Sequence, residues 1–143
     1  MFERIILSLA IAALAVGAYQ ASRWWMLWRV RQHGTHDPLL SAFVPGRPAV
    51  LYFTAEHCTA CRFQQRPALE KLQQHYQDIQ IIQIDTDQHP QDAQRWGVMS
   101  LPTTFILDPD GKPQTVNYGV ASTQKLRLQL DDIYQSKDNA HGN

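Results

Sequence analysis

Apolar and polar positions divide this 143-residue chain into two unlike parts. Residues 5–19 form one uncharged apolar run, IILSLAIAALAVGAY, whereas the later sequence alternates between short apolar runs and longer mixed segments. The first run is shorter than the roughly 20 apolar residues that comfortably span a bilayer and is nearer the length of a signal-peptide core. The pattern predicts a hydrophobic N-terminal helix followed by a separate folded domain.

Aromatic and basic residues follow the apolar run closely. They are Trp24, Trp25, Trp28, Arg23, Arg29 and Arg31. Such a collar is typical of the interface where a helix leaves the membrane, so it favours one transmembrane helix over residues 5–30, with helix tilt compensating for the short run. A signal peptide cleaved after residues 16–18 and a core helix remain alternatives, although a core helix would leave the collar unexplained.

The rest of the chain is divided by composition. Residues 31–47 mix Gly, Pro, His and Asp without a sustained period, which predicts a linker. Residues 48–136 carry the periodic apolar segments of a single domain, and residues 137–143 form a polar tail. With an anchor or signal segment over residues 1–30, the chain is predicted to consist of a hydrophobic N-terminal helix, a linker and one folded domain.

Within the domain, strand-like and helix-like segments alternate. Four short runs favour strands: residues 49–53, 79–85, 103–107 and 114–118. Helical patterns begin at Cys58, at Pro90 and at Ser122, and the turn DPDG over residues 108–111 joins the last two strands into a hairpin. The order β-α-β-α-β-β-α predicts an α/β fold with a mixed central sheet flanked by helices.

Composition and charge narrow the classes of function. Lys and Arg total 13, as do Asp and Glu, so the formal net charge is zero and the basic excess of a nucleic acid-binding domain is absent. Hydrophobic residues make up 44% of the chain, which is enough for an ordinary core. We therefore expect a folded monomer with no nucleic acid partner.

The two cysteines, Cys58 and Cys61, lie where the first predicted strand gives way to a helix. They would close too small a loop to stabilise a fold, whereas a Cys-x-x-Cys pair at such a junction is typical of a redox site. A thiolate at Cys58 would meet unpaired N–H groups and the helix dipole, which lower its pKa and favour it as the nucleophile. Cys61, one turn later, is then the resolving thiol.

The residues around this pair resemble the thioredoxin family. The similarity covers roughly residues 48–134 and rests on AVLYFTAEHCTACR at 49–62, SLPT at 100–103, DPDG at 108–111 and the pair Tyr118-Gly119. It implies a thioredoxin-like fold and a protein thiol-disulfide oxidoreductase without a cofactor. It also implies a cis-Pro102 facing the disulfide, with Leu101 and Pro102 binding an extended substrate strand. The implied partners are protein thiols or disulfides and an upstream thiol donor or acceptor.

Several positions depart from the pattern of that family. Tyr52 stands where a buried acid is expected and Gln83 where its lysine partner is expected, so the usual proton acceptor for the resolving thiol is missing. Thr59 and Ala60 replace Gly-Pro, and His57 replaces a tryptophan. A protonated His57 would favour the neighbouring thiolate and make the disulfide more oxidising. We expect His57, Thr59, Ala60 and Tyr52 to modulate the chemistry.

The predicted active-site helix departs from the family at its proline as well. Pro67 lies one residue later than the proline that bends this helix in the family. Because a proline inside a helix removes one backbone hydrogen bond, its position sets where the helix bends. We expect the bend at a different turn.

Two other functions remain open at this point. The domain could be a non-catalytic binding module that presents the Pro102 loop, or the cysteines could bind zinc. Zinc needs four ligands, and the remaining ones would have to come from His33, His36, His57 or His75, which are not spaced as in a known zinc finger. We therefore expect no metal site.

The side of the membrane is the last expectation from the sequence. Three arginines follow the apolar run and one precedes it, which by the positive-inside rule would leave the domain in the cytoplasm. Many anchored thioredoxin-like proteins face the opposite way. We favour an extracytoplasmic domain and leave the cytoplasmic side open.

Overall fold

The structure is a computed structural model that describes residues 2–32 and 37–141. Its elements are α1 (Phe2–Gln32), the 3-10 helix η2 (Pro38–Ala42), β1 (Ala49–Thr54), the π-helix η3 (Cys61–Gln65), α2 (Arg66–His75), β2 (Gln80–Asp85), α3 (Pro90–Arg95), β3 (Thr103–Leu107), β4 (Pro113–Tyr118) and α4 (Thr123–His141). After α1 and η2, the order of strands and helices is the predicted β-α-β-α-β-β-α, with η3 and α2 together forming the first helical segment.

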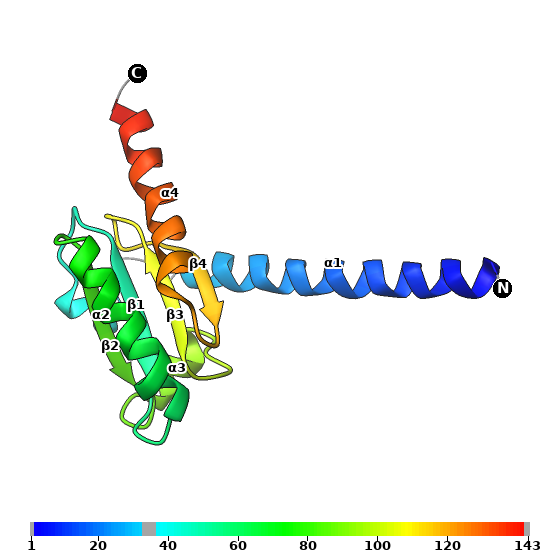
Figure 1. Cartoon of the computed structure of the whole chain (residues 1–143), viewed down its shortest axis with the longest axis horizontal. Coiled ribbons are helices and arrows are strands. Elements are labelled where there is room, and N and C mark those ends of the chain that lie inside the picture. Colours follow the sequence, from blue (N-terminus) through cyan, green and yellow to red (C-terminus); the bar gives the residue numbers. More distant parts are fainter. Residues whose placement is uncertain (1, 33–36, 142–143) are drawn as a thin grey trace.

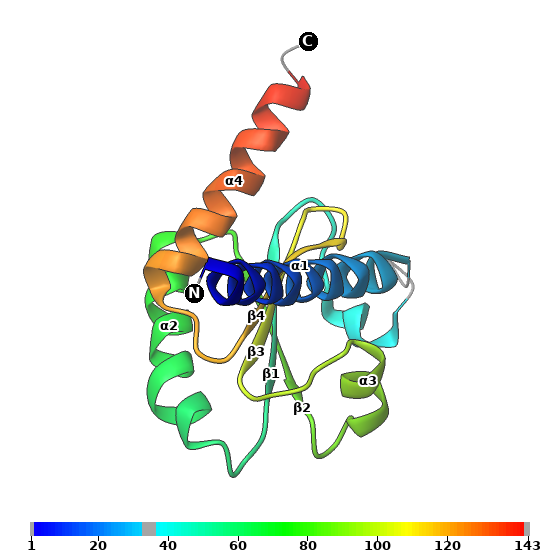
Figure 2. The ribbon, with the colours of Figure 1, turned by 90° about the vertical axis from the view of Figure 1, so that its right-hand side faces the viewer.

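The four strands form one mixed sheet in the order β2-β1-β3-β4. β1 runs parallel to β2, to which it is connected through α2, and antiparallel to β3, which forms a hairpin with β4. Helices α2 and α4 cover one face of the sheet and α3 lies on the other, as Figures 1 and 2 show. This confirms the predicted α/β architecture.

The central strand β1 sends its side chains alternately into two cores. Leu51 and Phe53 belong to the core on the α3 side, whereas Val50 and Tyr52 belong to the core beneath α2 and α4. All six residues of β1 are buried, as expected for a strand covered on both faces. The alternation places Tyr52 in the same core cluster as Cys61.

The segment that was predicted as a linker contains a structured element. Leu39 and Leu40 of η2 are buried in the core on the α3 side, and the Asp37 side chain caps η2 by accepting a hydrogen bond from the backbone N–H of Leu39 at 3.0 Å. A single turn is too short to produce a helical period, so its two apolar residues gave no pattern in the sequence. Helix α4 likewise continues to His141, beyond the predicted start of the tail.

Asp37 also connects η2 to α3. Its carboxylate accepts hydrogen bonds from the Arg95 guanidinium, at 2.8 Å to Oδ1 and 3.2 Å to Oδ2, and from Trp96 Nε1 at 2.9 Å. Asp37 and Trp96 are buried, whereas the Arg95 side chain is 35% exposed. The cluster thus attaches the segment that precedes β1 to the end of α3.

Helix α1 is one continuous helix of 31 residues, about 46 Å long at the α-helical rise of roughly 1.5 Å per residue. Its stretch Glu3–Trp25 has a mean hydropathy of 1.8, and none of its most apolar window is buried. The helix projects from the β4 side of the domain and contacts β4 (Figure 1). Its length and composition allow it to cross a membrane, and a signal sequence would meet the same criteria.

Candidate active site

The cysteine pair lies directly after β1, where the chain turns into the active-site helix. Cys58 and Cys61 form a disulfide with an S–S distance of 2.08 Å and a Cα–Cα distance of 5.2 Å. Cys58 is partly exposed, whereas Cys61 is only 2% exposed. An attacking reagent therefore reaches Cys58 first.

A backbone donor is directed at the more exposed sulfur. The N–H of Cys61 donates a hydrogen bond to Cys58 Sγ at 3.1 Å. Thr59 and Ala60 form the beginning of the helix between the two cysteines, so this N–H belongs to the first turn, whose donors have no partner within the helix. When the pair is reduced, the same donor is placed to stabilise a thiolate at Cys58.

His57 is exposed and lies at the mouth of the site. It lines a cavity of about 250 Å³ together with Cys58, Thr59 and Phe63. Phe63, an apolar residue of the helical segment predicted to begin at Cys58, is 68% exposed. The structure thus brings His57 and Thr59 beside Cys58, as their positions in the sequence suggested, and adds an exposed aromatic ring.

Tyr52 contacts the active-site helix from below. Its hydroxyl group donates toward Thr54 Oγ1 and toward the carbonyl oxygen of Cys61, each at 3.3 Å. Burial raises the pKa of Tyr52 above its usual value, against smaller lowering effects of the Thr54 hydrogen bond and the Arg66 charge. A phenol with a raised pKa keeps its proton near neutral pH, so Tyr52 acts as a donor and does not replace a carboxylate base.

The active-site helix begins with a π-helical turn. The backbone N–H of Arg66 bonds to the carbonyl of Cys61, five residues earlier, in place of the usual four. This wider turn lies directly before α2, whose second residue is Pro67, and the displaced bend stays a prediction. The π-helical turn directs Gln65 inward, where the side chain is completely buried and pairs with both backbone groups of Ala121, at 3.2 and 2.8 Å.

The loop before β3 lies at the same end of the sheet as the cysteines. The Leu101–Pro102 peptide bond is cis, as predicted. In the antiparallel register Phe53 of β1 faces Thr103 of β3, so the start of β3 is adjacent to the end of β1. The carbonyl of Pro102 accepts a hydrogen bond from the N–H of Gly119 at 2.8 Å, which joins this loop to the end of β4.

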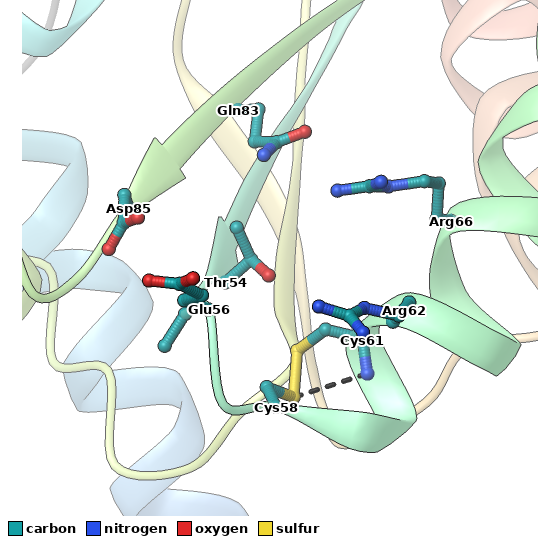
Figure 3. Close-up of a pocket in the computed structure, with 9 residues that line it drawn as sticks. Thr54, Glu56, Cys58, Cys61, Arg62, Arg66, Gln83 and Asp85 are labelled. Carbon is teal, nitrogen blue, oxygen red and sulfur yellow. Dashed lines mark hydrogen bonds between the residues drawn. A yellow bond between two sulfur atoms is a disulfide. The ribbon is translucent and has the colours of Figure 1, made fainter.

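A second cavity of about 250 Å³ opens beside the disulfide (Figure 3). It is lined by Thr54, Ala55, Glu56, Cys58, Cys61, Arg62, Arg66, Gln83 and Asp85. Gln83 faces Tyr52 across the β1–β2 pairing. Neither Arg62 nor Arg66 was predicted as a site residue, although two basic residues four apart directly after Cys61 indicate a charged surface beside the resolving cysteine.

A zinc site was the alternative function for the cysteines. Over residues 2–32 and 37–141, no group of three or more His, Cys, Asp or Glu side chains lies close enough together to hold a metal ion. His33 and His36, two of the histidines weighed as zinc ligands, lie outside the described residues.

The amino-acid sequence also matches a known protein family. A sequence model of the thioredoxin family matches residues 33–132, which is 100 of the 143 residues. The chain belongs to the thioredoxin family. It is a thioredoxin-like thiol-disulfide oxidoreductase with its Cys-x-x-Cys pair at disulfide distance, and the whole of α1 lies outside the matched region.

Individual thioredoxins show the extent of the similarity. The chain is 36% identical to the thioredoxin of Borreliella burgdorferi over 94 residues, covering 65% of this chain and 79% of that one. It is 42% identical to the thioredoxin of Streptomyces clavuligerus over 60 residues, covering 42% of this chain and 55% of that one. The solved structure of thioredoxin-2 from the malaria parasite aligns with a TM-score of 0.56 at 29% identity, covering 60% and 82% of the two chains.

Proposed function

We propose that this thioredoxin-family protein is tethered to a membrane and that Cys58 attacks protein disulfides while Cys61 resolves the mixed disulfide. The observation that carries the assignment of roles is the difference between the sulfurs: Cys58 is partly exposed and receives an N–H hydrogen bond, whereas Cys61 is 2% exposed. The exposed sulfur can meet a large substrate, and the buried one can reach only its neighbour.

The reaction runs in two exchanges. The Cys58 thiolate attacks one sulfur of the substrate disulfide, forming a mixed disulfide and releasing the other substrate sulfur as a thiol. The Cys61 thiolate then attacks Cys58 Sγ, forming the Cys58–Cys61 disulfide and releasing the second substrate thiol. Two electrons pass to the substrate, and an upstream dithiol protein returns the pair to its reduced form.

Replacing Cys61 with alanine tests these roles. The Cys61→Ala variant is expected to accumulate a covalent complex with a disulfide-containing protein such as insulin, because the second exchange cannot occur. The complex should disappear on addition of dithiothreitol and should be absent from Cys58→Ala, as scored on non-reducing gels. A domain that bound the same protein equally well without a reducible link would be a binding module.

The substrate surface is proposed to surround the cis peptide bond. Leu101 is partly buried and Pro102 is buried, in a loop at the same end of the sheet as Cys58. Met99, two residues before Leu101, is 76% exposed, and Val120, directly after Gly119, is 42% exposed. Together with Phe63 these apolar side chains suit an extended, partly apolar segment of an unfolded or flexible protein.

Membrane tethering is proposed for α1 because its apolar stretch lies free of the domain core and ends in tryptophans and Arg23. The full chain is expected to stay in the membrane fraction after alkaline carbonate extraction, whereas a chain lacking residues 1–30 should be released. The intact mass of the membrane form should include the apolar segment. A mass that begins after residue 18 would identify α1 as a cleaved signal peptide instead.

We propose that the domain faces the extracytoplasmic side. After brief reduction of intact cells, a membrane-impermeant maleimide should then label Cys58. Labelling only after cell lysis would place the domain in the cytoplasm, the side that the arginine count favours.

A further inference from the structure

The cavity beside the disulfide is lined by opposite charges. Arg62 and Arg66, from the active-site helix, line one wall, and Glu56 and Asp85 line the other. Figure 3 shows both guanidinium groups directed into the space over Cys61, with the two carboxylates on the far side. The buried cysteine thus lies at the cationic wall of the cavity.

The resolving thiol needs a way to lose its proton. In the proposed reaction Cys61 attacks as a thiolate, but its burial disfavours that charge. The position beneath it holds Tyr52, a proton donor, and the residue paired with Tyr52 in the sheet is the neutral Gln83. Proton abstraction by the usual buried carboxylate is therefore not available from these two positions.

We propose that Arg62 and Arg66 are positioning residues that stabilise the Cys61 thiolate by charge, in place of a general base. The proposal rests on the proposed role of Cys61 as the resolving thiol. With two guanidinium groups nearby, the thiol ionises by releasing its proton to solvent through the open cavity. The charge of Arg66 acts on the neighbouring Tyr52, whose hydroxyl group donates to the Cys61 carbonyl oxygen: it lowers the pKa of Tyr52 against the larger raising effect of burial.

The carboxylates near Cys61 allow charge stabilisation by the arginines to be distinguished from proton abstraction by a carboxylate. Glu56 and Asp85 lie in the same cavity and oppose a thiolate, and the exposed His57 lies in the adjoining cavity together with Glu56 and Arg62. If a carboxylate were the base, its removal would slow the attack of Cys61 on the mixed disulfide. Under charge stabilisation by the arginines, the same removal makes Cys61 easier to ionise and leaves this attack at least as fast. The two mechanisms therefore predict opposite effects on the rate of the second exchange.

Cys61 can be measured alone, because Cys58→Ala leaves it as the single thiol of the chain. We expect the pH midpoint of its alkylation, in the full chain in detergent, to rise by about one unit in Arg62→Gln/Arg66→Gln. Arg62→Lys/Arg66→Lys should retain most of the original value. Glu56→Gln and Asp85→Asn should each lower the midpoint.

The same variants are then tested with both cysteines present, by equilibrating the dithiol with oxidised glutathione. In that reaction the protein disulfide forms, one glutathione disulfide breaks and two glutathione thiols are released. At a pH above the Cys61 midpoint of both proteins, a stabilised thiolate favours the reduced form, so Arg62→Gln/Arg66→Gln should there shift the equilibrium about tenfold toward the protein disulfide, equal to roughly 30 mV. Both arginine side chains are exposed, so the fold should tolerate the change.

An unchanged midpoint and equilibrium in Arg62→Gln/Arg66→Gln, with the Cys61→Ala complex still forming, would overturn the role of the arginines and leave the proposed function intact. A slower release of substrate from the mixed disulfide in Glu56→Gln or Asp85→Asn would also overturn it and would identify a carboxylate base. Failure of the Cys61→Ala complex to form, in contrast, would count against the proposed function itself.

Discussion

Asp37→Ala is expected to lower the free energy of unfolding by about 3 kcal/mol. The substitution leaves the indole N–H of buried Trp96 and the backbone N–H of Leu39 without their acceptor. It also removes an ion pair with Arg95 that is made through two hydrogen bonds. For a domain of about 100 residues this corresponds to a decrease in Tm of roughly 15 °C. Urea or thermal unfolding of the full chain in detergent measures it.

The matched control for Asp37 is Asp92, which binds the same guanidinium group. Asp92 Oδ1 lies 2.7 Å from Arg95 Nη2, but the Asp92 side chain is 22% exposed, against 2% for Asp37. Because partly exposed ion pairs contribute little, Asp92→Ala should lower stability by less than about 1 kcal/mol. Equal effects of the two substitutions would show that the charge of Arg95, and not the buried acceptor, determines the stability.

Most of the fold followed from local patterns that the structure retains. The apolar runs before Cys58 and after Tyr76 became β1 and β2, and DPDG joined β3 to β4. These elements were predictable because each is long enough to show a period or is bounded by Gly and Pro. The turn η2 was missed because Leu39 and Leu40 gain their role only through contacts with distant strands.

The parts of the site that follow from sequence motifs could be predicted. The directions in which the side chains of the active-site helix point could not. Cys58, Cys61 and the cis form of Pro102 could be anticipated from motifs. The exposure of Phe63 and the burial of Gln65 could not, because the spacing was read with a regular helical period and the π-helical turn shifts that period by one residue. The proposed roles of the predicted site residues stay predictions until the variants are measured.

Gln65→Ala is the second substitution with a large expected effect. It would leave the N–H and the carbonyl of Ala121, a completely buried residue, without their partners, so we expect a loss of about 3 kcal/mol in the free energy of unfolding. The neighbouring Gln64 is the control, since it is exposed on the same turn and its replacement by alanine should change stability by less than about 0.5 kcal/mol.

The hydrogen bonds of Gln65 can be tested separately from the size of its side chain. Gln65→Glu keeps the size of the side chain and an acceptor for the Ala121 N–H, but it replaces the amide donor to the Ala121 carbonyl with a carboxylate oxygen. We expect this variant to be at least as unstable as Gln65→Ala, because a buried charge then faces an unpaired acceptor. A Gln65→Glu variant of wild-type stability would mean that Gln65 only fills space, and that the π-helical turn is not held by its bonds to the loop before α4.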